Sequence, residues 1–419
     1  MKSIVLKILQ ILAKRALKKY QPEIIGITGS FGKTSAKEAI FCVLKNKFKA
    51  RKSIKSYNNE FGLPLTILGC FSGEKSPLKW LNIFLSGLKL IFFRDKNYPQ
   101  ILILEMGADK PNDIEYLIKI ASCKIAVITD IGATHLETFG SMENLIKEKQ
   151  KIIEHLPCDG WAILNKDNEI VEKMKKKTEA RILSFGFSEE AEIRSSELML
   201  DYELDKIKGI NFKIKHQGNV VPVFLTGVVG YVSIYAVLVA VAIGTIYKMN
   251  LIEISEALKE YKSPPGRMNL IKGVKDTLLI DGTYNASPKT VEASLEILSK
   301  LPCKERKWAV LGDMLALGKF TDEEHQKIGK KVVDYKIDVL VVLGERAREI
   351  ASIAEKNGMS KDKIFSFDHI DEAGLFIQNR MQQGDILLIK GSHAMHMEKI
   401  VKEIMAEPLR DRELIICNS

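Results

Sequence analysis

The sequence predicts an α/β fold with two domains, the first built on a mostly parallel sheet with a small antiparallel subdomain. Short apolar runs that end in glycine or polar residues alternate with segments of helical periodicity, as expected where helices connect parallel strands. Residues 182–223 instead alternate polar and apolar side chains, which favours antiparallel strands. The proline–glycine break at Lys262–Asn269 separates two regions that share the strand–helix rhythm.

The bulk composition agrees with a multidomain globular protein. A chain of 419 residues suits about two or three domains, and 46% hydrophobic and 28% charged residues are ordinary for such proteins. The net charge of +10 favours anionic ligands, but the lysines are dispersed, so nucleic acid is not expected as a partner. The six cysteines are far apart and form no C-x-x-C pair, which argues against a zinc site or a disulfide framework and favours a cytoplasmic location.

Residues 1–22 are expected to form an N-terminal amphipathic helix. Ile4, Ile8, Ile11 and Leu12 recur near helical spacing, while lysines and an arginine occupy the other face. No small-residue cleavage site follows, so a signal peptide is not predicted. Packing on its own domain is the simpler interpretation of this helix, and peripheral contact with a membrane surface is the alternative.

Residues 23–262 are expected to form the central domain. IIGITGS reads as a buried strand and a loop, and KTSAKEAIFCVLKNKF reads as the helix that follows. Further buried-strand candidates are QILILEMGA (Gln100–Ala108), KIAVITDIG (Lys124–Gly132) and WAILNKDN (Trp161–Asn168). Apolar-periodic segments separate them, which predicts a parallel sheet with helices on both faces.

The stretch Gly218–Tyr247 carries no charge and is long enough to suggest a membrane span. Pro222, Gly227 and Gly230 interrupt it, however, and AVLVAVAIG within it is typical of a buried helix. We therefore expect a short strand followed by one fully buried helix.

Residues 263–419 are expected to form a second domain with a Rossmann-like α/β fold. Four units each read as a strand followed by a turn: TLLIDGTYNAS, KWAVLGDM, VLVVLGE and DILLIKGS.

The segment GITGSFGKTS (Gly26–Ser35) lies between the first predicted strand and a helix, which is the context of a phosphate-binding loop (P-loop). Glycines let backbone amides close around phosphate oxygens, and the helix N-terminus adds partial positive charge. Lys33 would reach the terminal phosphates, and the Thr34 hydroxyl would ligate Mg²⁺.

The general pattern G-x-x-x-x-G-K-[ST] would place its first glycine at Ile27, so the glycines are displaced here. A purely structural turn is the alternative interpretation. The predicted nucleotide contacts of the loop are Gly29, Ser30, Gly32, Lys33, Thr34 and Ser35.

The form T-G-S-x-G-K-[ST] is followed in order by further motifs. They are NNEFGLPLTIL (Asn58–Leu68), LEMGAD (Leu104–Asp109), THLETFGS (Thr134–Ser141), ILNKDN (Ile163–Asn168), PPGRMN (Pro264–Asn269), IDGTYNASP (Ile280–Pro288), LGDMLALG (Leu311–Gly318) and KGS...ME (Lys390–Glu398). On these motifs the sequence resembles the Mur ligase family, the ATP-dependent amide-bond synthetases of peptidoglycan assembly. YNASP, GDMLALG and GLPLTIL look most like the members that add D-alanyl-D-alanine.

The resemblance implies that ATP and Mg²⁺ are used to activate a carboxylate as an acyl phosphate, which an amine then attacks. It implies UDP-muramoyl-tripeptide and D-alanyl-D-alanine as small-molecule substrates of a monomeric enzyme. ATP would lie mainly on the central domain, and closure of the second domain would complete the site.

The resemblance also implies roles for residues outside the loop. Glu105 would bind Mg²⁺ beside Thr34, and His135 would ligate a second metal ion. Lys149 matches a lysine that the family carbamylates, which turns a cation into an oxygen ligand. The competing interpretations are a solvent-facing Glu105, a structural His135 and a surface lysine at 149.

Further residues match the nucleotide-binding positions of the family. Asn165 and Asn168 would lie near the adenine, Arg267 would reach the phosphates from the second domain, and Asp281 would accept hydrogen bonds from the ribose hydroxyls. Turn formation by the asparagines and helix capping by Asp281 are the alternatives. The implied catalytic residues are Lys33, Lys149, His135 and Arg267. Asn285 would lie beside the nucleotide, and Lys390 and Ser392 are candidates to hold the dipeptide.

The sequence departs from the family pattern in three places. Only a short segment precedes the loop, where the family has a domain that holds the UDP group. GVVGYVS stands where the family has G-x-H-N-x-x-N, and Ala316 replaces the acidic residue of GDMLELG. Two rival functions therefore stay open: a ligase of the same superfamily with a folate, poly-glutamate or lipid-linked acceptor, and a nucleotide-binding homologue without catalysis.

Overall fold

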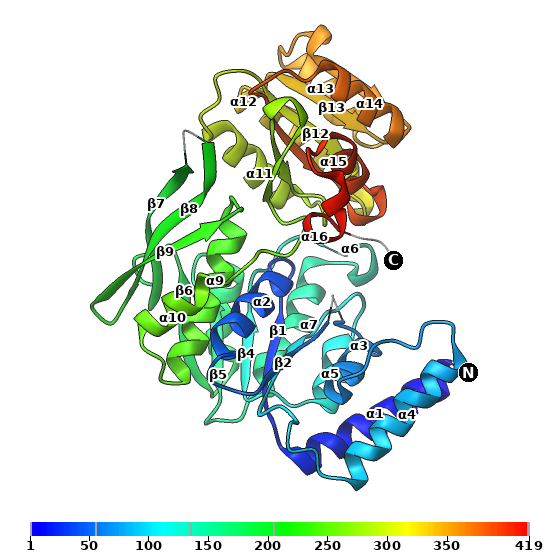
Figure 1. Ribbon diagram of the computed structural model, residues 1–419, viewed down its shortest axis with the longest axis vertical. Helices are drawn as coiled ribbons and strands as arrows, with labels where there is room; N and C mark the ends of the chain where they lie inside the picture. Colours follow the sequence, from blue (N-terminus) through cyan, green and yellow to red (C-terminus); the bar gives the residue numbers. More distant parts are fainter. Residues whose placement is uncertain (1, 55–56, 135, 204–205, 417–419) are drawn as a thin grey trace.

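The computed structural model describes residues 2–54, 57–134, 136–203 and 206–416. Figure 1 shows two α/β bodies stacked along the long axis of the molecule, each built around its own sheet. The predicted α/β fold is confirmed.

The first sheet has nine strands in the order β2-β3-β1-β4-β5-β6-β7-β8-β9. They are β1 (Glu23–Thr28), β2 (Ala50–Lys52), β3 (Ile101–Glu105), β4 (Ile125–Ile128), β5 (Trp161–Asn165), β6 (Arg181–Gly186), β7 (Ile193–Glu203), β8 (Lys206–His216) and β9 (Asn219–Thr226). Neighbours from β2 to β7 are parallel, whereas β7, β8 and β9 are antiparallel. The sheet is therefore mostly parallel with an antiparallel extension, as predicted.

Two details of the antiparallel region differ from the expectation. The antiparallel strands continue the main sheet, and β6 pairs in parallel with both β5 and β7 although it lies in the stretch read as antiparallel. The reason is the connection, because α8 (Glu169–Lys173) returns the chain to the same end of the sheet before β6 begins. Alternation of polar and apolar residues specifies a half-buried strand but not its direction.

Helices cover both faces of the first sheet. One face is covered by α2 (Lys33–Leu44), α9 (Tyr231–Ile246) and α10 (Leu251–Leu258), and the other by α1 (Lys2–Tyr20), α3 (Gly62–Leu68), α5 (Asp113–Ile120) and α7 (Met142–Glu154). Successive strand side chains point to opposite faces, so Ile25 enters the first core and Ile24 the second. The short helix α6 (Leu136–Phe139) precedes α7.

The uncharged stretch forms β9 and then α9, as expected. The α9 side chains from Ala236 to Gly244 are all buried between the sheet and α2. Within the described ranges, no helix has both the length and the apolar character needed to span a bilayer.

The N-terminal helix α1 packs on the central domain through Leu9, Leu12, Ala13 and Ala16. A second helix, α4 (Pro77–Phe92), lies beside it and was not predicted. The two helices run in the same direction. Gly87 of α4 packs on Leu12 of α1, and further along both helices Lys19 bonds to Leu90, so their C-terminal ends meet. Figure 1 shows this pair at the lower right edge of the molecule, away from the C-terminal body.

The second sheet has the order β10-β11-β15-β12-β13-β14, with only the β10–β11 pair antiparallel. Its strands are β10 (Asn269–Lys272), β11 (Leu278–Asp281), β12 (Lys307–Gly312), β13 (Val339–Leu343), β14 (Ile364–Phe367) and β15 (Ile386–Lys390). Helices α11 (Pro288–Lys300), α12 (Thr321–Asp334) and α13 (Arg348–Lys356) cover one face, and α14 (Ile370–Arg380), α15 (Glu398–Ile404) and α16 (Asp411–Leu414) lie on the other side. The four predicted strands are β11, β12, β13 and β15.

Candidate active site

A cavity of about 540 Å³ lies where the two domains meet, beyond the carboxyl ends of parallel strands from both sheets. This volume suits a small-molecule ligand, and this end of a sheet is where open α/β folds bind ligands. The predicted site residues on its wall are Gly29, Ser30, Gly32, Lys33, Thr34, Glu105, Lys149, Asn165, Asn168, Arg267, Asn285, Lys390 and Ser392. The fold thus brings together residues that are far apart in the sequence.

The loop after β1 has the backbone that its glycines allow. Gly29 has φ 145° and Gly32 has φ 80°, values that residues with a side chain rarely adopt. A Cβ atom at Gly29 would also lie 2.1 Å from Oγ1 of Thr129. Gly26 belongs to β1 instead, where a Cβ atom would lie 2.3 Å from Sγ of Cys123. The displaced glycine is therefore a packing residue of the strand, and the loop itself begins later.

Three basic side chains converge on the cavity. Nζ of Lys33 and Nζ of Lys149 both donate to the carbonyl oxygen of Gly29, at 2.7 Å and 3.1 Å. Arg267 enters from the other domain, with its guanidinium 3.9 Å from the ring centre of Tyr284. In the described part of the chain, Nε of Arg267 has no hydrogen-bond acceptor.

The charges of these groups are poorly compensated. Burial lowers the pKa of Lys33, and the neighbouring Arg267 lowers it further against the opposing effect of Glu105. Burial, and then the charge of Lys33, lower the pKa of Lys149 to about 7. A bound polyanion would relieve this crowding, so the cluster fits the phosphates of a nucleotide.

Beside the loop, a hydroxyl and a carboxylate lie together. Oγ1 of Thr34 donates to Oε2 of Glu105 at 3.2 Å, and Oε1 of Glu105 lies 3.0 Å from Nζ of Lys37. Glu105 and Lys37 are 1% and 0% exposed, so this is a buried ion pair. The oxygens of Thr34 and Glu105 are the ligand types that Mg²⁺ prefers.

The described residues hold no cluster of three or more histidine, cysteine or acidic side chains that could bind a metal. Mg²⁺ in phosphate sites typically takes few protein ligands and completes its shell with phosphates and water. Thr34 and Glu105 therefore fit Mg²⁺ bound together with a nucleotide. His135 lies outside the described residues.

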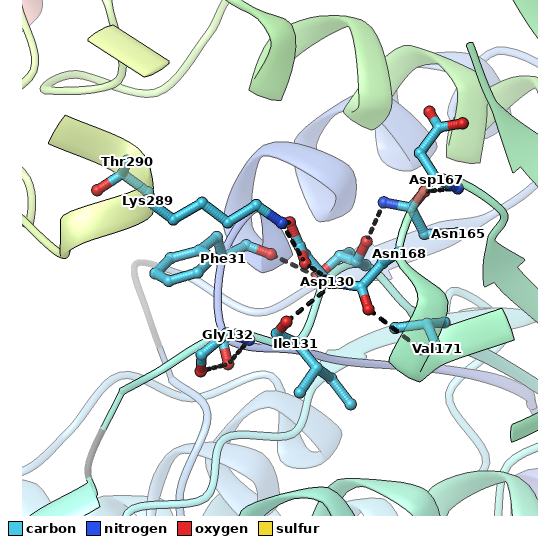
Figure 2. Close-up of polar contacts among 12 residues, drawn as sticks. Phe31, Asp130, Ile131, Gly132, Asn165, Asp167, Asn168, Val171, Lys289 and Thr290 are labelled. Atoms are coloured by element: carbon cyan, nitrogen blue, oxygen red, sulfur yellow. Dashed lines mark hydrogen bonds and ion pairs between the residues drawn. The ribbon is translucent and has the colours of Figure 1, made fainter. Parts of the chain in front are cut away.

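Figure 2 shows the polar network beside the phosphate loop, centred on Asp130 just after β4. Nδ2 of Asn168 donates to Asp130 and to the carbonyl oxygen of Ile131, the latter at 2.9 Å. Nζ of Lys289, from α11 of the other domain, lies 2.8 Å from Oδ2 of Asp130. This ion pair joins the two domains across the cavity.

The two asparagines also serve their own turn. Oδ1 of Asn168 accepts from the backbone amides of Ile170 and Val171, which caps α8. Nδ2 of Asn165 donates to the carbonyl oxygen of Thr129 at 2.9 Å. Their side chains are thus held by local bonds on the cavity wall, and the turn-forming interpretation describes part of what they do.

The first turns of α9 place aromatic side chains on the cavity wall. Tyr231 and Tyr235 of α9 both make edge-on contacts with the ring of Phe187, with ring centres 5.7 Å and 5.2 Å apart. The hydroxyl of Tyr235 donates to Oδ2 of Asp167 at 2.8 Å. At the polar positions of the family pattern stand Val229, Gly230 and Ser233, and the two tyrosines lie beside them in the sequence.

Two predicted nucleotide contacts are not on the cavity wall. Ser35 is wholly buried in the first turns of α2. The carboxylate of Asp281 is wholly buried and accepts from the amides of Gly266 and Thr283 and from the Thr283 hydroxyl. Burial raises the pKa of Asp281 to about 6. In this conformation, Asp281 fixes the turn that carries Arg267 and does not face the space where a ribose would bind.

Asn285, which follows β11, and Lys390 and Ser392, at the end of β15, all lie on the cavity wall. Nζ of Lys390 donates to the carbonyl oxygens of Asn285 and Gly282, at 2.7 Å and 3.3 Å. Burial lowers the pKa of Lys390 to about 8. Oγ of Ser392 accepts from the backbone amide of Leu315 at 2.8 Å.

The sequence analysis missed three residues that shape this site: Lys37, Asp130 and Lys289. Lys37 stands one helical turn after Lys33, a spacing that places both on one face of α2. Asp130 follows the predicted strand KIAVITDIG, at the edge where ligand-binding side chains gather. Nothing in the sequence pairs Lys289 with it.

The matches to known families cover most of the chain. The model of the Mur ligase middle domain matches residues 84–244, and that of the Mur ligase glutamate ligase domain matches residues 266–393. The UDP-N-acetylmuramoyl-tripeptide–D-alanyl-D-alanine ligase of Bacillus subtilis (strain 168) is 28% identical over 96% of this chain and 80% of its own length. The ligase of the same name from Buchnera aphidicola subsp. Baizongia pistaciae is 30% identical over 92% of this chain and 75% of its own length.

A solved structure agrees with these matches. The MurF ligase from Thermotoga maritima in complex with ADP superposes with a TM-score of 0.78 at 27% identity, covering 97% of this chain and 84% of that chain. Family models, relatives and structure therefore agree along nearly the whole length, and the chain belongs to the Mur ligase family.

Proposed function

We propose that this protein is an ATP-dependent ligase of peptidoglycan precursor synthesis, which adds D-alanyl-D-alanine to UDP-N-acetylmuramoyl-tripeptide. The relatives that match over more than nine-tenths of the chain carry this activity in their names. One observation carries the proposal: Lys33, Lys149 and Arg267 all lie on a cavity that the glycine-containing loop also lines.

The role of ATP is to phosphorylate the acceptor carboxylate, so that an acyl phosphate is open to attack by the amine of the dipeptide. The amides after Gly29 and the N-terminus of α2 would hold the phosphate chain, with Lys33 against its terminal groups. Arg267 would neutralise developing charge from the opposite side. These residues would align the reactants and stabilise the developing charge. Alignment and charge stabilisation supply most of the rate enhancement in group transfer.

We propose Thr34 and Glu105 as the protein ligands of Mg²⁺. The ion would supply charge neutralisation at the phosphates. Lys37 would orient Glu105, since it holds the second carboxylate oxygen of that side chain. Asn165, Asn168 and Asn285 are proposed to border the nucleotide, and Lys390 and Ser392 to border the dipeptide, because all five lie on the cavity wall.

Lys149 is proposed to be carbamylated. Carbamate formation needs the neutral amine, and a pKa of about 7 makes that form available near neutral pH, which supports the assignment. The backbone carbonyl of Gly29 holds this amine at the cavity wall.

The protein is proposed to act as a cytoplasmic monomer without a nucleic-acid partner. The cysteines among the described residues are free thiols, which suits a reducing compartment.

Phosphate release from ATP tests the function directly. With Mg²⁺, turnover is expected only when UDP-N-acetylmuramoyl-tripeptide and D-alanyl-D-alanine are both present. Turnover with a folate, glutamyl or lipid-linked acceptor instead would replace the substrate assignment. Nucleotide binding without any turnover would show that the protein is a non-catalytic homologue.

A further inference from the structure

The α1–α4 pair carries an apolar surface that the fold does not use. Five large side chains of α4 point outward: Leu78, Leu81, Leu85, Leu88 and Phe92, with exposed fractions from 38% for Leu88 to 74% for Leu78. They recur every three or four residues, so they form one stripe along the helix. We call these five residues the α4 stripe.

The α4 stripe is separate from the face that packs on the protein. Ile83 and Gly87 are buried, and Trp80, Phe84, Leu90 and Ile91 contact the core beneath the helix. The helix is therefore apolar on two faces, of which only one has a partner in the described structure. Ile4 and Ile11 on α1 and Phe93 directly after α4 are also exposed.

The exposed charges around this surface are mostly basic. Neither α1 nor α4 contains an aspartate or a glutamate. The exposed basic residues on and beside the two helices are Lys7, Lys14, Arg15, Lys18, Lys19, Lys75, Lys79, Lys89, Arg94 and Lys96. Two exposed acids flank α4: Glu74, which lies 3.5 Å from Nζ of Lys79, and Asp95, which stands between Arg94 and Lys96.

Hydrogen bonds join the two helices to each other at their C-terminal ends. Nζ of Lys19, at the end of α1, donates to the carbonyl oxygens of Leu90, Ile91 and Phe93, which caps the last turn of α4. The hydroxyl of Tyr20 donates to the carbonyl oxygen of Leu90 at 3.0 Å. The α4 stripe is thus held outward by the fold.

We propose that the α1–α4 pair binds the surface of an anionic lipid bilayer, with the α4 stripe inserted among the acyl chains and the basic residues at the headgroups. An amphipathic helix with large apolar residues on one face and lysines beside them is the type that lies in the membrane interface. Neither helix is of the spanning type, so the contact is peripheral. Figure 1 places the pair at the edge away from the C-terminal body, so contact there leaves the cavity between the domains accessible.

The charge pattern favours lipid over a second copy of this chain. Two copies meeting through the same surface would oppose lysine to lysine, which is unfavourable. Anionic headgroups instead match the basic residues, and each lysine near such a surface strengthens attachment.

Vesicle co-sedimentation of the full chain tests the proposal. The protein is expected to bind vesicles of phosphatidylcholine with phosphatidylglycerol, to bind phosphatidylcholine alone at least about tenfold more weakly, and to dissociate as salt rises. The variant L81S/L85S/F92S is expected to lose about tenfold or more of the binding. It should keep soluble ligase turnover, which reports its folding, because none of the three residues lines the cavity.

A matched control carries three serine substitutions at exposed apolar residues on other faces: Phe224, Ile252 and Leu375, which are 51%, 69% and 52% exposed. This control is expected to bind vesicles like the wild type. Equal binding by the stripe variant and the wild type, or no binding to anionic vesicles by the wild type, would overturn the proposal. If the wild type is a dimer that does not bind vesicles, and the stripe variant is a monomer, the surface would be assigned to self-association instead.

Discussion

Nζ of Lys37 lies 3.0 Å from Oε1 of Glu105, and both side chains are almost wholly buried beside the phosphate loop. Thr34 contacts the other oxygen of the same carboxylate at 3.2 Å. Lys37 therefore fixes the orientation of the group that we propose as a Mg²⁺ ligand.

Lys37→Met is expected to destabilise the fold, because it leaves the buried carboxylate of Glu105 without its cation. Breaking a buried pair by removing one partner costs about 3–5 kcal/mol of unfolding free energy. Denaturant unfolding measures this loss. The exposed pair Lys47–Glu253 provides the control, since solvent screens this pair and Lys47→Met should cost far less. Similar losses in the two variants would contradict the assigned role of the Lys37–Glu105 pair.

Lys33→Ala is expected to abolish turnover while the fold persists. The side chain lines the cavity and contacts its own loop, so its loss removes charge at the phosphates and no core packing. Phosphate release with both substrates measures the activity, and unfolding by urea measures the fold. Wild-type turnover in this variant would refute the assignment of the loop as the ATP site.

Lys149→Ala is expected to lose most of its activity and to recover part of it with short carboxylic acids. Carbamylation makes this position an oxygen donor, and a small acid could occupy the space vacated by the side chain. Removal of bicarbonate should depress the wild type but not the variant. A folded variant that no acid rescues would count against a carbamylated lysine here.

The pKa of Lys390, about 8 against an ordinary value of 10.5, predicts a pH dependence of stability. Between these values the unfolded chain binds the proton more tightly than the folded one, so the free energy of unfolding rises with pH in this window. Relative to Lys390→Met, the wild type should gain up to about 3 kcal/mol between pH 8 and 10.5. Below pH 8 the difference should be flat. Urea unfolding at several pH values makes the comparison. A constant difference between the two proteins across the window would contradict the lowered pKa of Lys390.

Lys289→Ala is expected to loosen the contact between the domains with little change in stability. The ion pair with Asp130 is partly exposed, so its loss should cost about 1 kcal/mol or less. It nevertheless bridges the cavity, and small-angle scattering should record a larger radius of gyration. Lys300→Ala, which removes an exposed pair within a single helix, should leave the radius unchanged. An unchanged radius in both variants would show that the bridge does not hold the domains together.

The strands at the site were predictable because each is a short apolar run that ends at a functional residue. ILILE ends at Glu105 and LLID ends at Asp281, and both runs are strands in the structure. The phosphate loop was predictable for the same reason, since its glycines, lysine and threonine occur between a strand and a helix.

Features that depend on tertiary contacts were not predictable. The direction of β6 depends on the crossover before it, and the Asp130–Lys289 pair depends on how two domains dock. The position of Asp281 off the cavity wall depends on a turn that uses both of its carboxylate oxygens. The helix α4 is a different case, because its exposed polar residues Lys79, Asn82, Ser86 and Lys89 recur at helical spacing and the sequence could have shown it.

The most direct test of the proposed chemistry follows oxygen atoms through one turnover. UDP-N-acetylmuramoyl-tripeptide is labelled with heavy oxygen in its terminal carboxylate and incubated with ATP, Mg²⁺ and D-alanyl-D-alanine, and the released phosphate is analysed by mass spectrometry. An acyl phosphate predicts that each phosphate carries one labelled oxygen from the carboxylate. Amide formation with unlabelled phosphate would contradict the account.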